Sequence, residues 1–177
     1  IRRVEKEYST KIHYKPVFLG GILKTLGNKA NIDIPIKAKY MIKDCKLWAD
    51  KYKINFKFNN YFPISTLNLM RGVLVTAQKK KNHNFINSIF DAIWVNNLNL
   101  NNDLVIKKIL INLKINPKNF LQEISEQNIK DDLKKRTDQA IKIGIFGLPT
   151  FLVNKKLFWG QDRLEFALNE AKKNKCF

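Results

Sequence analysis

The chain has 177 residues, with 33 Lys and Arg against 15 Asp and Glu, and a net charge of +18. A chain of this length can bury a core without a disulfide framework, and its 45% hydrophobic content excludes a disordered polyelectrolyte. No apolar run approaches the ~20 residues that span a bilayer, so we expect no membrane partner. Cys45 and Cys176 form neither a CxxC pair nor a metal-ligand cluster, so we expect no metal site.

The positive charge comes mainly from lysine, because Arg occurs only at positions 2, 3, 71, 136 and 163. A nucleic-acid-binding protein more often carries Arg clusters interleaved with exposed aromatic residues. The run Lys79-Lys80-Lys81 is typical of a solvated turn between helices. We therefore expect no specific nucleic-acid partner, only nonspecific attraction to polyanions.

The first quarter of the chain predicts a helix, a strand and a second helix. Ile1, Val4 and Tyr8 form a helical stripe, and residues 12–19 are typical of a strand that ends at Gly20-Gly21. After a polar loop at 27–31, Pro35 is expected to open a helix over 35–52. The expected buried side of that helix carries Tyr40, Met41, Cys45, Leu47, Trp48 and Tyr52.

The rest of the chain predicts a helical region followed by a hairpin. An extended aromatic loop is expected at 56–63. Helices are expected over about 65–79, 85–94, 102–113, 117–127 and 129–143. A strand-type run at 145–153, a turn at Asn154-Lys155 and a returning strand at 156–159 then precede a last helix.

A strand hairpin and helix preceded by Gly147-Leu148-Pro149-Thr150 indicate the second half of a thioredoxin-like domain. We therefore expect an α/β fold in which residues 1–26 and 144–177 form this domain and 27–143 form a large all-helical insertion. The first β-strand and the start of the first helix are missing from this pattern. We accordingly expect an N-terminally truncated sequence.

Two motifs at the end of the chain suggest a peptide-binding site. In this architecture the Leu148-Pro149 bond is cis, which leaves the backbone N–H and C=O of Leu148 free to pair with an extended peptide. The helix start at Gly160-Gln161-Asp162 can hold a carboxylate on its N–H groups, and Asp162 can take an ammonium group. A carboxylate beside an ammonium group is the γ-glutamyl end of glutathione. Alternatively, these residues merely cap the helix and Asp162 pairs with Arg163 or a nearby lysine.

The sequence resembles the 2-hydroxychromene-2-carboxylate isomerases and the kappa-class glutathione transferases, which share a DsbA-like thioredoxin fold. The matching residues span most of the chain. They are Lys15-Pro16 to Gly20-Gly21, Gly27-Asn28-Lys29, Pro35, Lys37, Tyr40-Met41, Trp48-Ala49, Phe62-Pro63, Met70-Arg71, Phe90-Asp91-Ala92-Ile93-Trp94, Thr137, Phe146 to Thr150 and Phe158 to Arg163.

The resemblance implies that glutathione is the cofactor and that Asn28, Leu148, Pro149, Gln161 and Asp162 bind it. Lys37 would favour an anionic substrate or the glycyl carboxylate of glutathione. Arg71 and Trp94 are assigned to structure. The catalytic Ser of the family lies in a turn after its first strand. It is expected upstream of Ile1, because neither Ser9 nor Ser65 sits in such a turn.

For the intact protein, the resemblance implies an isomerase in which the glutathione thiolate adds to a small conjugated substrate, allows rotation and leaves again. Whether the truncated chain itself is active stays open at this point. The alternatives are a kappa-like glutathione transferase or peroxidase, a DsbA-like disulfide oxidoreductase, which would need CxxC in the missing segment, and a noncatalytic fragment. A homodimer is compatible with the family. A cytoplasmic location is expected, or the mitochondrial matrix in a eukaryote.

Overall fold

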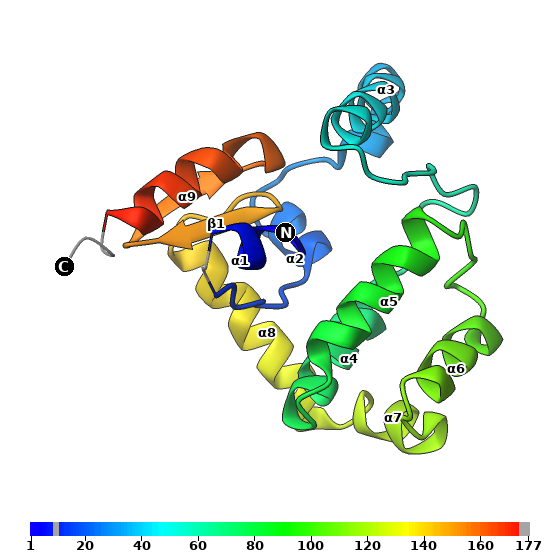
Figure 1. Ribbon diagram of the computed structural model, residues 1–177. Coiled ribbons are helices and arrows are strands. Elements are labelled where there is room, and N and C mark those ends of the chain that lie inside the picture. The colour runs from blue at the N-terminus through cyan, green and yellow to red at the C-terminus, as the bar shows by residue number, and fades with distance from the viewer. Residues whose placement is uncertain (9–10, 174–177) are drawn as a thin grey trace. The chain divides into compact units, whose positions relative to one another are not determined.

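Two compact units are present in the computed structural model, which describes residues 1–8 and 11–173 (Figure 1). Contacts between Cα atoms define a first unit, Ile1–Asn28 with Lys135–Phe177, and a second unit, Lys29–Lys134. Ser9 and Cys176 lie outside the described residues. The domain boundaries expected above, with an insertion over 27–143, remain a proposal.

A β-hairpin and a helix organise the first unit. Its elements are α1 (Val4–Glu7), α2 (Leu19–Thr25), the C-terminal part of α8 (Gln127–Lys142), β1 (Thr150–Val153), β2 (Lys156–Trp159), the 3-10 turn η2 (Gln161–Arg163) and α9 (Leu164–Lys172). β1 and β2 pair antiparallel with Thr150 opposite Trp159, and α9 packs on both strands (Figure 1). The predicted hairpin and last helix are confirmed, although β1 begins at Thr150 rather than at residue 145.

The hairpin turn has the sequence and backbone geometry of a tight two-residue connection. Asn154 and Lys155 have φ of 49° and 64°, and two successive positive φ values match the twist of paired strands. The Asn154 side chain donates a hydrogen bond of 3.1 Å to the carbonyl of Glu170 in α9. The turn is therefore fastened to the helix that covers the sheet.

The strand predicted over residues 12–19 is wrong. Residues 11–18 form no regular element, and α2 begins at Leu19. Among the described residues no strand pairs with this segment, and a strand needs a neighbour for its backbone groups. Instead, the Phe18 N–H donates to Thr137 Oγ1 at 3.0 Å. A Cβ at Gly20 would lie 2.8 Å from the Phe18 ring, so this glycine serves helix packing rather than strand termination.

The N-terminal helix is also shorter than predicted. It begins at Val4 instead of Ile1 and forms a single turn that ends at Glu7. Val4 is buried, whereas Ile1 and Tyr8 are 41% and 37% exposed. The apolar stripe therefore identified the helix, but only one of its three members reaches the core.

The second unit is helical, and its predicted helices are confirmed. They are the 3-10 turn η1 (Asn31–Asp33), α3 (Pro35–Tyr52), α4 (Leu67–Gln78), α5 (Asn82–Trp94), α6 (Asp103–Asn112), α7 (Pro117–Glu123) and the start of α8. α4 and α5 lie side by side (Figure 1). Phe85 of α5 and Phe120 of α7 are 1% exposed, and their ring centroids lie 5.6 Å apart. Both rings meet at Gly72 of α4, where a side chain would have no room.

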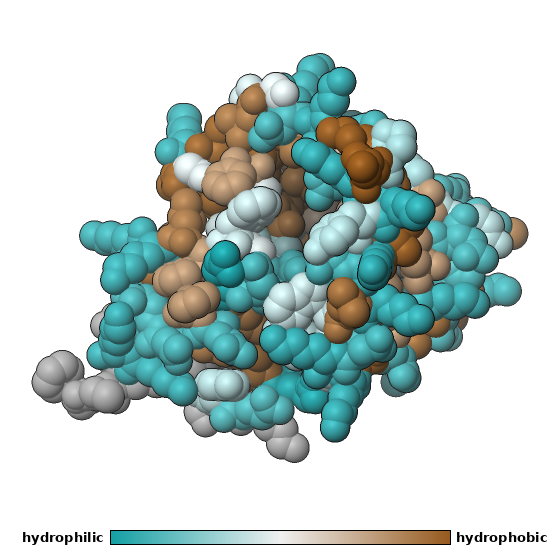
Figure 2. Space-filling model, turned by 90° about the horizontal axis from the view of Figure 1, so that it is seen from above, coloured by the Kyte–Doolittle hydropathy of each residue, from teal (hydrophilic) through white to brown (hydrophobic). Residues whose placement is uncertain are grey.

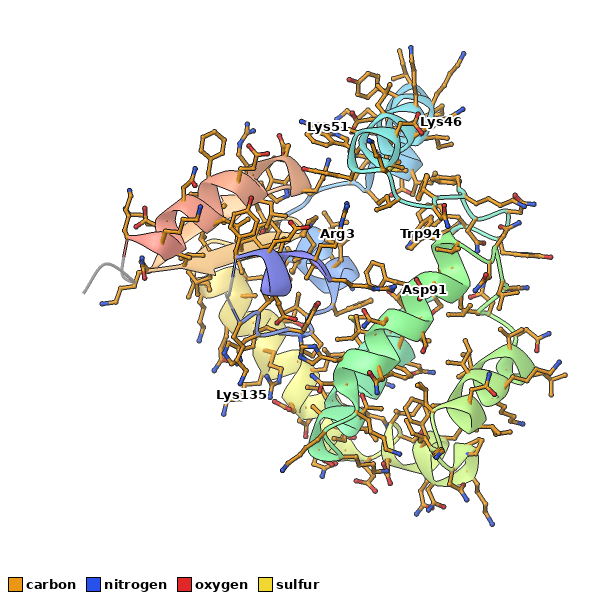
Figure 3. All side chains as sticks on the ribbon, viewed as in Figure 1. Arg3, Lys46, Lys51, Asp91, Trp94 and Lys135 are labelled. Atoms are coloured by element: carbon orange, nitrogen blue, oxygen red, sulfur yellow. The ribbon has the colours of Figure 1, made fainter. Side chains whose placement is uncertain are left out.

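The predicted aromatic loop at 56–63 is confirmed, and it gathers around the end of α5. Rings of Phe56, Phe58 and Phe62 lie 5.8–5.9 Å from the Trp94 ring, which Figure 3 shows at the end of α5. Trp94 accordingly has the structural contacts expected of it.

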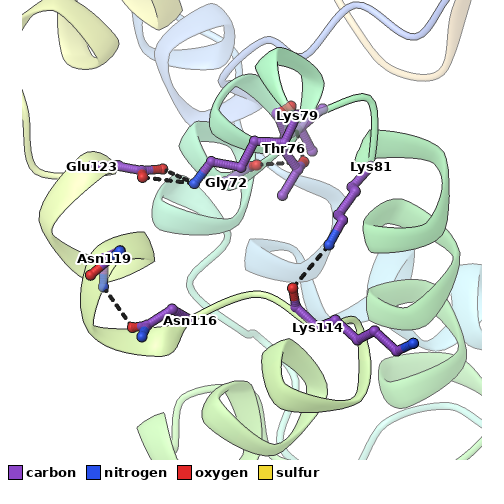
Figure 4. A network of polar contacts seen from close by, with 9 residues as sticks. Gly72, Thr76, Lys79, Lys81, Lys114, Asn116, Asn119 and Glu123 are labelled. Atoms are coloured by element: carbon purple, nitrogen blue, oxygen red, sulfur yellow. Dashed lines mark hydrogen bonds and ion pairs between the residues drawn. The ribbon is translucent and has the colours of Figure 1, made fainter.

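The lysine run is a turn, as predicted, but two of its side chains make specific contacts (Figure 4). Lys79 Nζ lies 2.6 Å from a Glu123 carboxylate oxygen in α7. Lys81 Nζ donates to the carbonyls of Leu113 and Lys114 at 3.2 and 2.9 Å, where α6 ends. A cation suits the carbonyl end of a helix. These lysines therefore join helices rather than simply facing solvent.

The predicted buried side of α3 is wrong in part. Tyr40 and Leu47 are 67% and 56% exposed, and Ala49 is the one buried residue of this helix. Figure 3 shows Lys46 and Lys51 on this helix. Figure 2 shows that hydrophobic residues in brown lie interspersed among hydrophilic residues in teal on the surface seen from above. A helical apolar pattern predicts a helix, whereas burial also depends on a covering element. Every described helix is too short or too polar to traverse a lipid bilayer.

Candidate functional site

The turn before β1 presents backbone groups that are free to bind a ligand. The Leu148–Pro149 peptide bond is cis, as predicted, and Thr150 Oγ1 closes the turn by donating to the Gly147 carbonyl at 2.7 Å. Leu148 is 37% exposed. Within the described part of the chain, its N–H and C=O have no hydrogen-bond partner. An unpaired donor and acceptor on one exposed residue can pair with the backbone of a peptide ligand.

The second predicted motif lies directly beside this turn. The Gly160 N–H donates a hydrogen bond of 2.9 Å to the Pro149 carbonyl. Gly160 has φ +103° and ψ 152°, a conformation that L side chains rarely adopt, and a Cβ there would collide with Asp162 Oδ1. The hairpin therefore brings the two motifs together.

The helix start carries the charged group expected to recognise an ammonium ion. Gln161 and Asp162 are exposed, and their backbone N–H groups have no partner among residues 1–8 and 11–173. Asp162 Oδ2 accepts from Arg163 Nη1 at 2.8 Å. The pairing of Asp162 with Arg163, which the sequence left open, is therefore present. The two side chains are 38% and 52% exposed, so water screens this ion pair.

An aromatic pair beside the turn is a feature that sequence analysis did not assign to the site. The Phe146 and Trp159 rings have centroids 4.8 Å apart and an interplanar angle of 58°. Gly147 is buried against the indole, and a Cβ there would lie 2.5 Å from Trp159 Nε1. This contact could have been predicted from the two-residue turn at Asn154-Lys155, because that turn sets the hairpin register in which Trp159 lies opposite Thr150.

The remaining predicted ligand residues lie on exposed turns and helix ends. Asn28 follows α2, within the segment predicted as a polar loop. Its backbone N–H donates to the Leu23 carbonyl at 2.9 Å. Asn28 shares the first unit with Leu148 and Asp162, whereas Lys37 belongs to the second unit. Lys37 lies in the first turns of α3 and borders a hollow of about 500 Å³. Its other lining residues are Asn31, Ile36, Tyr40, Met41 and Asp44.

Other reactive side chains offer little competing chemistry. Cys45 is a half-buried free thiol, and burial raises its pKa, with a further contribution from the Asp44 carboxylate. A raised pKa leaves less of the nucleophilic thiolate. Among the described residues, no group of three or more His, Cys, Asp and Glu side chains is placed to hold a metal ion.

Known proteins with similar sequences are enzymes of two classes. The chain is 25% identical over 175 residues to a 2-hydroxychromene-2-carboxylate isomerase of Pseudomonas sp. (strain C18), covering 97% of this chain and 80% of that protein. It is 23% identical over 179 residues to glutathione S-transferase kappa 1 of Rattus norvegicus, covering 92% of this chain and 78% of that protein. These are the two classes that the motifs resemble.

The fold and family are established over nearly the whole chain. A solved structure of a 2-hydroxychromene-2-carboxylate isomerase superposes with a TM-score of 0.87 and 22% identity, covering 99% of this chain and 86% of that one. The expected α/β thioredoxin-like fold with a helical insertion is therefore confirmed. The family model for the DSBA-like thioredoxin domain matches residues 1–172. The chain belongs to the DSBA-like thioredoxin domain family.

Proposed function

We propose that this protein is a glutathione-dependent isomerase that acts on a small conjugated, anionic substrate. The observation that carries the proposal is the free backbone edge of Leu148, joined through the Pro149–Gly160 hydrogen bond to a helix start with free N–H groups. The likeness to 2-hydroxychromene-2-carboxylate isomerases supports the reaction class.

The residues of the first unit fit the chemical groups of glutathione. The N–H and C=O of Leu148 would pair with the cysteinyl unit, as in the addition of a strand. The N–H groups of Gln161 and Asp162 would hold the γ-glutamyl carboxylate. Asp162 would exchange its exposed partner Arg163 for the ligand's ammonium group, at a cost of about 0–1 kcal/mol. Asn28 would add a contact from the turn after α2.

In this proposal, the protein's own groups bind glutathione and the substrate and orient them. Glutathione, when bound, supplies a thiolate that adds to a conjugated bond and leaves again. The cis-Pro149 turn and the hairpin hold the Leu148 backbone edge in place, and Lys37 would attract the carboxylate of an anionic substrate. Burial and the Asp44 carboxylate raise the pKa of the Cys45 thiol, so this residue is given no role in the proposal.

A kappa-type glutathione transferase is the second candidate, favoured by the likeness to the rat transferase. A disulfide oxidoreductase is disfavoured because a protein disulfide has no γ-glutamyl end for Gly160-Gln161-Asp162 to hold. We also retain three predictions from the sequence analysis: a cytoplasmic location, a homodimer and the lack of a specific nucleic-acid partner.

Calorimetric titration of the full chain with glutathione tests the binding site. We expect saturable binding that Asp162→Asn weakens by about tenfold, because an ammonium group loses its charged partner. Asp103→Asn is the matched control, since Asp103 is an exposed carboxylate in the first turn of α6. The absence of binding to the unmodified chain at millimolar glutathione would refute the proposed function.

Product analysis with a cis-configured, conjugated keto acid separates the two reaction classes. An isomerase converts it to the trans form and leaves the amount of glutathione unchanged, whereas a transferase accumulates a thioether. Lys37→Ala should raise KM about three- to tenfold by removing one partly screened charge. Lys39→Ala, two residues along the same exposed helix, should leave KM unchanged. A thioether as the sole product would contradict the isomerase.

A further inference from the structure

Glu170 of α9 is a charged residue that is buried within the first unit, at 8% exposure. One of its carboxylate oxygens accepts a hydrogen bond of 2.9 Å from Lys156 Nζ of β2, and the other accepts one of 2.9 Å from Lys173 Nζ at the end of α9. A buried carboxylate is costly unless such partners satisfy it. Charge-assisted hydrogen bonds from a strand and from its own helix therefore hold this side chain in place.

These contacts fasten the end of α9 to the turn of the hairpin. Lys156 begins β2 directly after the turn, and the Asn154 side chain in the turn donates to the Glu170 carbonyl at 3.1 Å. At the opposite end of the hairpin, the Gly160 N–H donates to the Pro149 carbonyl at 2.9 Å. The hairpin and α9, which packs on both strands (Figure 1), are thus joined at both ends.

A tilt of α9 against the hairpin would displace the ligand groups proposed at the helix start. Asp162 precedes Glu170 by eight residues, which is roughly 12 Å along a helix. Over that length, a tilt of about 5° about one end moves the other end by about 1 Å. Displacements of about 1 Å are enough to weaken contacts with a bound ligand strongly. The angle between α9 and the hairpin therefore matters for binding.

We infer that Glu170 is a positioning residue of the glutathione site, whose bonds to the hairpin keep the helix start at Gln161 aligned with the backbone edge of Leu148. This inference rests on the proposed function. It adds to the site a residue that acts through the helix and the hairpin rather than by touching glutathione.

Calorimetric titration of the full chain with glutathione tests this role. We expect Glu170→Gln to raise the Kd about fivefold, because both lysines lose their charged partner. Lys156→Met should raise the Kd about twofold, since it breaks the bond to β2 and leaves Lys173 paired with the carboxylate. Circular dichroism establishes that each variant folds. If Glu170→Gln does not fold, Lys156→Met carries the test, because it leaves the buried carboxylate with a partner.

Glu165→Gln is the matched control for the loss of a negative charge. Glu165 is exposed, belongs to the same helix and lies closer in sequence to Asp162 than Glu170 does. If charge alone mattered, this variant would weaken glutathione binding at least as much as Glu170→Gln. We expect its Kd to equal that of the unmodified chain, and an equal loss in the two variants would refute the positioning role.

A spectroscopic readout separates positioning from a general loss of stability. In ¹H–¹⁵N correlation spectra without ligand, Glu170→Gln should shift the backbone amide signals of Gln161 and Asp162. Asn59→Ala is the control, because Asn59 is buried and donates to two carbonyls within the second unit. It should lower stability but leave both those signals and the Kd for glutathione unchanged.

The outcomes separate the two proposals. If glutathione does not bind to the unmodified chain, the proposed function fails and the positioning role fails with it. If glutathione binds but neither Glu170→Gln nor Lys156→Met raises its Kd, the positioning role is refuted while the glutathione site stands. A weaker affinity of Glu170→Gln with unshifted signals of Gln161 and Asp162, or an equal loss of affinity in Asn59→Ala, likewise refutes it.

Discussion

The carbonyl of Pro149 accepts a hydrogen bond of 2.9 Å from the N–H of Gly160, and this single contact joins the cis-proline turn to the start of the last helix. The two residues stand next to each other because the hairpin has a two-residue turn and pairs Thr150 with Trp159. The candidate binding site thus depends on the register of one small hairpin.

Replacing Gly160 should damage both stability and binding. Gly160→Ala places a Cβ at φ +103° and against the Asp162 carboxylate. We expect a loss of about 1–3 kcal/mol in the free energy of unfolding, measured by urea denaturation, and weaker glutathione binding by calorimetry. Gly27→Ala is the control. Gly27 has φ +66° with nothing within 4 Å of the added Cβ. Gly27→Ala should therefore lower the free energy of unfolding by an amount at the low end of that range and leave glutathione binding intact. Equal stability of Gly160→Ala and the unmodified chain would contradict this expectation.

Asn59 should be a key polar residue of the second unit. It is 2% exposed, its amide donates to the carbonyls of Ile93 and Leu98 at 2.9 and 3.0 Å, and its oxygen accepts from the Tyr61 N–H at 2.8 Å. Asn59→Ala should lower the free energy of unfolding by about 3 kcal/mol, because it leaves buried groups unpaired.

The neighbour Asn60 provides the comparison for that measurement. Asn60 is exposed, and its backbone N–H, which alanine retains, donates to Asn97 Oδ1 at 2.8 Å. Asn60→Ala should therefore change stability by less than about 0.5 kcal/mol. If Asn59→Ala and Asn60→Ala lower the free energy of unfolding by similar amounts in urea denaturation, the buried hydrogen bonds of Asn59 contribute little to stability.

Glu170 should make stability depend on pH in the acid range. Hydrogen bonds from Lys156 and Lys173, both 2.9 Å long, lower the pKa of this carboxyl from 4.5 to about 2. Because the folded-state pKa lies below the unfolded one, the stabilisation is present above pH 4.5 and is lost as pH falls toward 2. Urea denaturation between pH 6 and pH 2.5 should therefore show a steeper loss for the unmodified chain than for Glu170→Gln. Glu165→Gln, an exposed change in the same helix, should keep the steep loss. If the stability of Glu170→Gln falls with pH in parallel with that of the unmodified chain, Glu170 is not the cause of the acid-range loss.

Replacing Gly72 by alanine tests whether helix propensity or core packing determines stability at this position. In an exposed helix, Gly→Ala stabilises by about 1 kcal/mol. Here the new Cβ would lie 2.6 Å from the Phe120 ring and 2.9 Å from the Phe85 ring. We therefore expect Gly72→Ala to destabilise by about 1–3 kcal/mol, because both buried rings must shift. Thermal unfolding measures the effect, with Asn84→Ala on exposed α5 surface as a change that should be neutral or mildly stabilising. A rise in Tm for Gly72→Ala would disprove the packing argument.

Local patterns in the sequence determined most of the elements. Pro35 and Pro117 open helices because proline lacks only an N–H that a first helical turn does not use. Asn154-Lys155 marks the hairpin because both residues adopt positive φ in a tight turn. These features depend on neighbours within a few residues along the chain, so the order of residues is sufficient to predict them.

Only the tertiary structure decided which residues are covered and which segments pair. Residues 12–19 have the pattern of a strand, yet no described strand lies beside them, and the Phe18 N–H donates a hydrogen bond to Thr137 instead. Tyr40 and Leu47 follow an apolar pattern on α3 but face solvent. The packing of Trp159 on Gly147 joins positions twelve residues apart through hairpin register. Burial and pairing require a partner from elsewhere in the chain, and that partner is a property of the folded whole.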